Sequence, residues 1–296
     1  MTRLLGRSVG SYCFFIFFGI TVFGGLIFAE AQTLPTVEVS DRASASATEP
    51  GIQVANLVQV EGEHPLAAPI RWAKAGVVKM GEEIQDYSCV LVKREKIDGV
   101  LGKEEVLFVK IRHEPFSVYL KYLKPRRFRG REAIYVEGQN GGNILAHGTG
   151  FEAILGTLTL APDSPQAMNG NLHPITDMGI INLAKRLEET GSEQLHRNSF
   201  SVNYSDCKLN GVDCVRLEIV NSERLKGDPF HKAHIFVDTT RNIPIRYAAW
   251  GWSECLDGEL PLLEEYTYLD LKINQKFTDC DFETTNPEYR YRNKKK

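Results

Sequence analysis

Alternating apolar and polar residues dominate the middle and the end of the chain. Such period-two alternation is typical of β-strands with one buried face. We expect strands at residues 87–97, 104–113, 116–123, 131–137, 143–147, 200–208, 212–219, 231–238, 243–252 and 262–273. Most of these runs are separated by short polar turns, and Asn210-Gly211 between two of them is a strong hairpin signal.

Two segments follow a helical period instead. From Pro65 to Asp86, apolar residues recur at steps of three and four: Ile70, Ala73, Val77, Met80 and Ile84. The second helix is expected from Pro174 to Thr190, with Gly191 just past its end and an apolar side formed by Ile180, Ile181, Ala184 and Leu187.

Together these elements predict a mainly β protein with helices, in the α+β class. Strands joined in order by short turns form an antiparallel meander, and a sheet of about ten strands must curl or split. We therefore expect one large curved antiparallel sheet, a half-open barrel whose concave face is covered by two or three helices. Its interior is either packed solid or hollow.

The N-terminal residues have the layout of a secretory signal. Arg3 and Arg7 precede an apolar run from residue 12 to residue 28, and Ala29-Glu30-Ala31 follows it. We expect residues 1–31 to be a signal peptide cleaved after Ala31, with a retained membrane anchor as the alternative. The mature chain would be exported and periplasmic or extracellular. Residues 32–63 read as a flexible linker, 64–291 as a single domain, and 292–296 as a basic tail.

Charge and cysteine content narrow the classes of function. The formal net charge is -3, so no global attraction to nucleic acid is expected. One of the six cysteines lies in the expected signal, which leaves an odd number in an oxidising compartment. Cys207 and Cys214 flank the Asn210-Gly211 turn symmetrically, so a cross-strand disulfide is possible there. Cys255 with Cys280 is a weaker candidate pair, which leaves Cys89 as a buried free thiol.

Motifs for catalysis or for metal and cofactor binding are weak. His231 and His234 have an H-x-x-H spacing, but residues three apart on a strand point to opposite faces, so we expect no metal site. Glu264-Glu265 and Asp279-Cys280-Asp281 are interpreted as solvated charges. The chain has no G-x-S-x-G elbow, no phosphate-binding G-K-[ST] loop and no H-E-x-x-H. We expect no cofactor and no enzymatic activity.

An ordered series of motifs carries a resemblance to a known family. The runs are "DYSCVLVKREKIDG", "EPFSVYLKYLKP", "GREAIYVEGQN", "HPITDMGIINLAKRL" and "EEYTYLDLKINQKFTDCDFETTNPEY". They resemble the secreted domain-of-unknown-function 1571 family over nearly all of residues 64–291. More distantly, the order of helix and strands is similar to the periplasmic lipoprotein-carrier fold, which implies a curved sheet around helices with a hydrophobic groove.

Three functions remain open in this order. The first is binding or carrying a hydrophobic ligand, either a lipid or the acyl chain of a lipidated protein, with contact to a membrane surface. The second is a non-catalytic sensor or scaffold with a filled core that acts through its surface. The third is an extracellular hydrolase.

If a groove exists, one set of alternating residues should line it. The candidates are Phe116, Val118, Leu120, Tyr122, Ile134 and Val136, with Trp250 and Trp252 as an aromatic lip. Basic residues near Pro125 form a candidate rim: Lys121, Lys124, Arg126, Arg127 and Arg129. This rim is either a solvated sheet edge that resists aggregation or a basic lip that meets a phosphate head group or an acidic partner.

Overall fold

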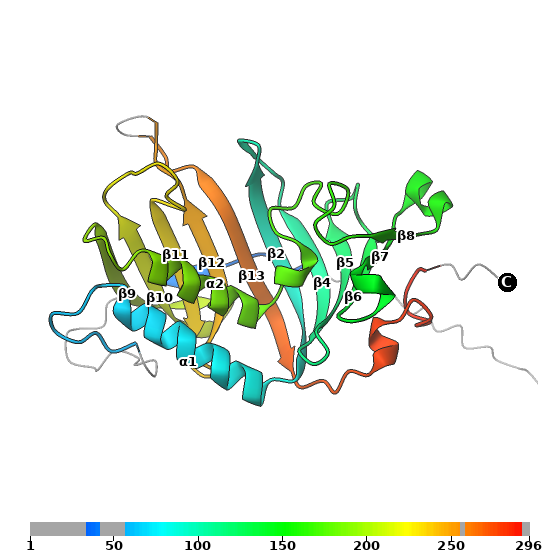
Figure 1. The fold of residues 1–296 in the computed structure, drawn as a ribbon, viewed down its shortest axis with the longest axis horizontal. Helices are drawn as coiled ribbons and strands as arrows, with labels where there is room; N and C mark the ends of the chain where they lie inside the picture. Colours follow the sequence, from blue (N-terminus) through cyan, green and yellow to red (C-terminus); the bar gives the residue numbers. More distant parts are fainter. Residues whose placement is uncertain (1–33, 42–56, 255–257, 292–296) are drawn as a thin grey trace, which may run out of the picture. The chain divides into compact units, whose positions relative to one another are not determined.

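The computed structural model describes residues 34–41, 57–254 and 258–291 (Figure 1). The description concerns the compact unit that begins at Pro35. The expected signal peptide, Cys255 and the basic tail 292–296 lie outside the described residues.

Strands and two α-helices make up most of this unit. The first meander contains β2 (Asp86–Ile97), β3 (Val100–Leu101), β4 (Glu105–Arg112), β5 (Ser117–Lys124), β6 (Glu132–Val136), β7 (Ile144–His147) and β8 (Thr157–Leu160). The second contains β9 (Phe200–Leu209), β10 (Val212–Asn221), β11 (Lys232–Asp238), β12 (Ile243–Trp250) and β13 (Leu262–Ile273). The remaining elements are β1 (Val39–Asp41), α1 (Ala67–Glu83), α2 (Ile180–Glu193) and the short 3-10 helices η1 (Asn140–Gly142), η2 (Gly150–Leu155), η3 (Ile175–Asp177) and η4 (Asp279–Phe282).

All the strands belong to one antiparallel sheet of 13 strands. Its order is β1-β9-β10-β11-β12-β13-β2-β4-β5-β6-β7-β8, with β3 paired to β2. The two meanders are therefore joined where the last strand, β13, pairs with the first long strand, β2. The sheet is curved and does not close, which confirms the expected fold class. The sequence pattern missed β1, β3 and β8, and β1 lies in the segment that was expected to be a linker.

The Asn210-Gly211 turn forms the expected hairpin. Leu209 pairs with Val212 directly across it. Both turn residues have positive φ, 46° at Asn210 and 82° at Gly211, as a type I′ turn requires. Asparagine and glycine suit this turn because they tolerate the left-handed region better than other residues.

Both α-helices lie on the concave side of the sheet (Figure 1). Trp72 of α1 is the largest of the fully buried side chains. Its indole nitrogen donates to Oδ1 of Asn242 at 2.7 Å. Gly191 lies inside α2, not past its end as expected, and a Cβ there would come within 2.9 Å of Ile70. The glycine thus permits close packing of α1 on α2. No helix in the described part of the chain has both the length and the apolar character to cross a membrane.

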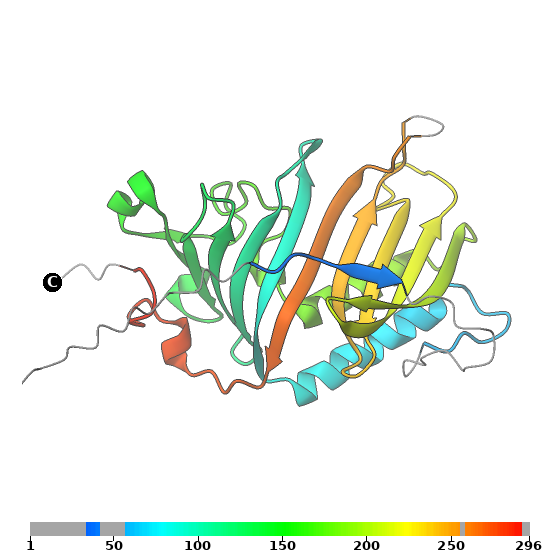
Figure 2. The same ribbon diagram turned by 180° about the vertical axis from the view of Figure 1, so that it is seen from behind.

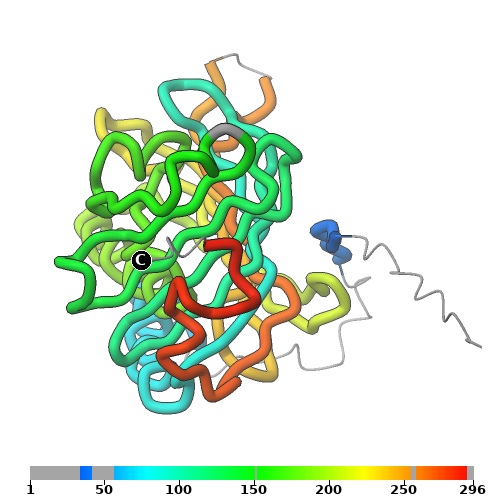
Figure 3. Tube along the Cα trace, turned by 90° about the vertical axis from the view of Figure 1, so that its right-hand side faces the viewer, coloured from blue at the N-terminus to red at the C-terminus, as the bar shows by residue number. Residues whose placement is uncertain are grey.

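Two segments lie on parts of the convex side. The segment around β1 lies on the side away from the helices (Figures 2 and 3), and β1 pairs with β9 through Val39 and Leu209. The C-terminal segment packs over β5 and β6, where the ring of Tyr289 stacks on Tyr119 with centroids 3.8 Å apart. Strands β5 and β6 are therefore buried on both faces.

The predicted disulfides are absent among the described residues. Cys207, Cys214 and Cys280 are free thiols, so the predicted pairing of Cys207 with Cys214 is wrong. The two residues are directly opposite, as expected, but they pack as small apolar side chains in the main core. Burial raises the pKa of Cys207 to about 11 and that of Cys214 to about 12. Cys89 is a buried free thiol, as expected.

Candidate ligand-binding site

A cavity of about 430 Å³ lies between the concave face of the first meander and the connection from β8 to α2. We call residues 161–179 of this connection the cover segment. The floor of the cavity is formed by side chains of neighbouring strands: Leu91, Leu107, Leu120, Ala133 and Ala146. Leu91 pairs with Leu107, Leu120 with Ala133, and Ala133 with Ala146, so these side chains share one face. This part of the floor is apolar, and the charged side chains of Lys93 and Glu95 lie further along the same face of β2.

The walls and roof are more mixed in character. Leu155, Leu158 and Leu160 form the outer wall on η2 and β8. The cover segment contributes Pro162, Gln166, Ala167, Asn169, Asn171, His173, Ile175, Asp177 and Met178, and α2 contributes Leu183 and Arg186. The volume is within the range of about 300–1,000 Å³ that small-molecule sites occupy. The space therefore suits one small ligand with a long apolar part.

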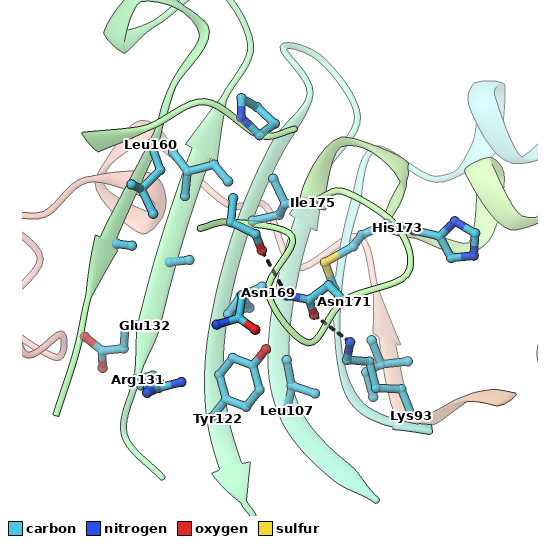
Figure 4. A pocket seen from close by; sticks show the side chains of 18 of the residues that line it. Lys93, Leu107, Tyr122, Arg131, Glu132, Leu160, Asn169, Asn171, His173 and Ile175 are labelled. Carbon is cyan, nitrogen blue, oxygen red and sulfur yellow. Dashed lines mark hydrogen bonds between the residues drawn. The ribbon is translucent and has the colours of Figure 1, made fainter. Parts of the chain in front are cut away.

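A buried lysine joins the cover segment to the floor of the cavity. Nζ of Lys93, on β2, donates to Oδ1 of Asn171 at 2.7 Å (Figure 4). It also donates to Oε2 of Glu95 at 2.7 Å. The backbone N–H of Leu172 also donates to Oε2 of Glu95. Burial lowers the pKa of Lys93, but the acidic groups around it raise this pKa more, so the net shift is upward. Lys93 is thus a charged anchor for the cover segment.

A second polar cluster holds the cover segment at His173, two residues after Asn171. Nε2 of His173 lies 2.8 Å from Oε2 of Glu264 on β13 and 2.6 Å from Nη1 of Arg186 on α2. The hydroxyl of Tyr266 donates to Oε1 of Glu95 at 2.6 Å and lies 3.0 Å from Oε2 of Glu264. The cluster therefore links the cover segment, α2 and both central strands.

Two carboxyl groups in this region have opposite pKa shifts. Burial raises the pKa of Glu264, but hydrogen bonds from His173 and Tyr266 and the charge of Arg186 outweigh burial, so this pKa lies below its usual value. Burial raises the pKa of Glu105, beside Lys93, and no other group reverses this shift. Oε2 of Glu105 is buried and accepts no hydrogen bond from the described residues, but it lies 3.6 Å from Nζ of Lys93 as an ion pair. Neither carboxylate is part of the cavity lining, but their partners Lys93 and His173 are.

Arg131 and Tyr122 line the cavity where the β5–β6 turn begins and ends. Arg131 forms an ion pair with Glu152 of η2. The ring of Phe128 meets Tyr122 edge-on at 5.7 Å, and the guanidinium groups of Arg127 and Arg131 each lie 4.3 Å from the Phe128 centroid. An aromatic and basic surface therefore borders this part of the cavity.

The structure separates the predicted groove residues into two faces. Leu120 and Tyr122 line the cavity, and Phe116 and Val118 contact the same concave core. Ile134 and Val136 lie on the convex face, packed with Tyr289 under the C-terminal segment. Their predicted place beside Leu120 is wrong because Leu120 pairs with Ala133, and directly paired residues point to the same face.

The predicted aromatic lip lies on the other meander, outside the cavity lining. Trp250 meets His234 edge-on at 4.8 Å, and Trp252 packs on His231 at 5.3 Å. The two histidines of the H-x-x-H spacing have separate partners: His234 contacts Glu218 and His231 contacts the carbonyl of Asn221. Among the described residues, no three metal-ligating side chains come together.

The predicted basic rim is divided between exposed and paired residues. Arg126, Arg127 and Arg129 are exposed on the β5–β6 turn. Lys121 is partly buried and lies 3.6 Å from the fully buried carboxylate of Glu132, and Lys124 is partly buried at the end of β5. Three of the five rim residues are thus free to meet a partner at the surface.

The most informative site residues were missed in the sequence, although a signal for two of them was present. Lys93 and Glu95 continue the alternation of Tyr87, Cys89 and Leu91, so they are charged residues on the buried face of β2. Glu264 was interpreted as a solvated charge, but its side chain is only 14% exposed and contacts His173. Charged residues in phase with a buried stripe mark the polar side of this cavity.

The fold and the cavity define a single-sheet β protein with room for one small ligand. The family model described as "Protein of unknown function (DUF1571)" matches residues 84–291. The chain therefore belongs to this family, as its motifs indicated. No curated protein matches the sequence.

Solved structures of the lipoprotein-carrier class are among the structural neighbours. A putative outer membrane lipoprotein-sorting protein domain from Vibrio parahaemolyticus is 14% identical, with 71% of this chain and 97% of that chain covered and a TM-score of 0.34. The lipoprotein LppX from Mycobacterium tuberculosis is 14% identical, with 72% and 97% covered and a TM-score of 0.39. A LolA superfamily protein from Nitrosomonas europaea is 11% identical, with 71% and 97% covered and a TM-score of 0.30.

Proposed function

We propose that this protein binds one amphipathic molecule with a hydrophobic chain in the cavity beneath the cover segment. The observation that carries the proposal is the cavity of about 430 Å³, whose floor has a continuous apolar part across neighbouring strands. Apolar surface of this extent is left unfilled only at a cost in lost contacts, which an apolar ligand restores. A free lipid and the acyl chain of a lipidated protein both offer this chemistry.

The distribution of polar groups supports an amphipathic ligand over a purely apolar one. Lys93, Tyr122 and Arg131 lie at one end of the cavity, beside Leu107, and Leu160 and Ile175 lie at the other end (Figure 4). A ligand with a polar head can satisfy the first group while its chain covers the second. We further propose, from the N-terminal sequence pattern, that the protein acts after export.

The test combines ligand recovery with a variant that fills the cavity. Protein purified from its own host is analysed by native mass spectrometry and lipid extraction, and affinity is measured with a fluorescent fatty acid. Ala146→Phe adds a ring to the cavity lining, so we expect affinity to fall by at least about tenfold, or about 1.4 kcal/mol. A change of a few degrees in the melting temperature of Ala146→Phe does not affect this comparison, because the variant stays folded during the binding assay.

The neighbouring residue on β7 provides a matched control. Leu145 belongs to the convex cluster, so Leu145→Phe adds similar bulk on the other face. We expect this variant to bind the probe as the parent does. Equal affinities for the parent and Ala146→Phe would contradict binding in this cavity.

The alternative is a sensor or scaffold that acts through its surface. The second meander favours it, because the space beneath α1 and α2 there is only about 40 Å³. A parent protein that neither carries a hydrophobe from its host nor binds the probe would favour this alternative.

A further inference from the structure

Two surface connections lie at the same end of the sheet and border the cavity. In an antiparallel sheet, alternate connections emerge at the same end, so the β5–β6 turn (125–131) lies beside the β7–β8 connection that holds η2. The pairing of Glu132 with His147 places these two connections next to each other. The ion pair between Arg131 and Glu152 joins them. We call residues 125–131 and 150–158 the rim surface.

Three large aliphatic side chains are exposed to solvent on the rim surface. Ile154 is 78% exposed, Leu155 is 65% exposed and Leu158 is 36% exposed. Single exposed aliphatic residues are common on protein surfaces, but a group of them beside a pocket marks an interaction site. Leu155 and Leu158 also line the cavity, so the exposed group is continuous with the cavity wall.

The same surface carries positive charge that the protein itself does not neutralise. Arg126, Arg127 and Arg129 are exposed, and in the described part of the chain none of them forms an ion pair. The acidic residue of η2, Glu152, is already paired with Arg131. Guanidinium groups bind phosphate oxygens in a bidentate geometry.

We propose that the rim surface docks on an anionic lipid bilayer. Ile154 and Leu155 enter the interface between head groups and acyl chains, while Arg126, Arg127 and Arg129 contact lipid phosphates. Aliphatic residues next to basic residues suit a charged interface, whereas a soluble acidic partner would not need the exposed aliphatic group. Docking in this orientation brings the cavity wall formed by Leu155 and Leu158 to the membrane. The proposal does not depend on which ligand the cavity holds.

Vesicle flotation tests this docking with the mature chain that begins after Ala31, so that the apolar run of residues 12–28 does not itself bind the vesicles. Vesicles of phosphatidylcholine with about a third phosphatidylglycerol are compared with pure phosphatidylcholine, because anionic lipid attracts basic segments. We expect binding to the anionic vesicles only, and weaker binding at high salt. The triple variant Arg126→Glu, Arg127→Glu, Arg129→Glu should lower the partition coefficient by at least about tenfold. Ile154→Ser should lower it several-fold, since less apolar surface enters the interface.

Controls use exposed residues at the other end of the strands and on α1. The triple variant Lys74→Glu, Lys272→Glu, Lys276→Glu makes the same change in net charge, and Val78→Ser removes an aliphatic side chain that is 60% exposed. Both should bind anionic vesicles as the parent does. Equal losses in the control and rim variants would overturn the proposal, because they would indicate a dependence on net charge alone.

Two further outcomes would also contradict membrane docking. The parent protein could fail to float with anionic vesicles, or the rim surface could instead join two copies through the free edge of β8, which size-exclusion chromatography with light scattering detects. Binding of the fluorescent fatty acid without vesicles is measured in parallel. Ile154 does not line the cavity, so Ile154→Ser should leave this binding unchanged, and the two proposals fail separately.

Discussion

The two meanders of the sheet cover their concave faces by different means. Strands β9–β13 lie beneath α1 and α2, and the space left there is about 40 Å³. Strands β2 and β4–β8 lie beneath the irregular cover segment, and the space left there is about 430 Å³. Leu183 and Arg186 of α2 border both spaces. One helix thus separates a packed half from a hollow half.

The difference follows from how each covering segment satisfies the hydrogen-bonding groups of its own backbone. A helix bonds its own N–H and C=O groups, so it can direct a continuous apolar stripe at the sheet. The cover segment has few such internal bonds, and it is held instead by polar contacts from Asn171, Leu172 and His173 to charged residues of the sheet. A cover of this kind closes over a cavity without filling it.

The largest expected effect is in the packed half. Trp72→Ala removes a side chain that is 1% exposed, together with its hydrogen bond to Asn242. We expect the free energy of unfolding to fall by about 4 kcal/mol in urea denaturation. A loss below about 1 kcal/mol would show that the space beneath the helices is as loosely filled as the cavity.

An intermediate effect is expected where the cover segment is fastened. The folded state lowers the pKa of Glu264, so the ionised form is the stabilising one. Glu264→Gln should therefore lower the free energy of unfolding by about 2 kcal/mol at pH 7. The difference from the parent should shrink as the pH falls below the unfolded value of about 4.3. Urea denaturation at pH 7, 5, 4 and 3 measures it.

A paired control isolates the contribution of burial at this position. Glu265, the next residue on β13, forms an ion pair with Arg246, and its side chain is more exposed than that of Glu264. Glu265→Gln should cost less than about 1 kcal/mol at pH 7. A difference between Glu264→Gln and the parent that stays constant down to pH 3 would contradict a role for the ionised carboxylate.

The smallest effect is expected on the wall of the hollow half. Leu158 lines the cavity and is already 36% exposed, so Leu158→Ala removes little apolar area from the folded protein. We expect the free energy of unfolding to change by less than about 1 kcal/mol. If the loss approached that of Trp72→Ala, the contrast between the halves would not hold.

The sequence pattern predicted most of the fold because half-buried strands alternate. Ten expected strands correspond to β2, β4–β7 and β9–β13, and both expected helices form. The pattern failed for β6 because both faces of this strand are covered, so Ile134 and Val136 are as buried as residues of the concave core. Alternation cannot identify the inner face of a strand that has no face in water.

The candidate site was harder to predict than the fold. Its floor depends on register between strands, and its polar side joins Lys93, His173 and Glu264, which lie far apart in the sequence. The cover segment has no periodicity that would reveal its place. The sequence pattern indicates only Lys93 and Glu95 of β2, because these charged residues occupy positions in an otherwise apolar alternation.

The pairing of β13 with β2 also has a consequence for synthesis of the chain. Residues 86–160 can form the first meander early, but β2 keeps an unpaired edge until residues 262–273 have been made. An exposed edge of this length is a template for pairing with another chain. Contacts between residues so distant in sequence also form slowly. A chain that stops before Leu262 would therefore leave β2 as an exposed edge strand that can pair with another chain.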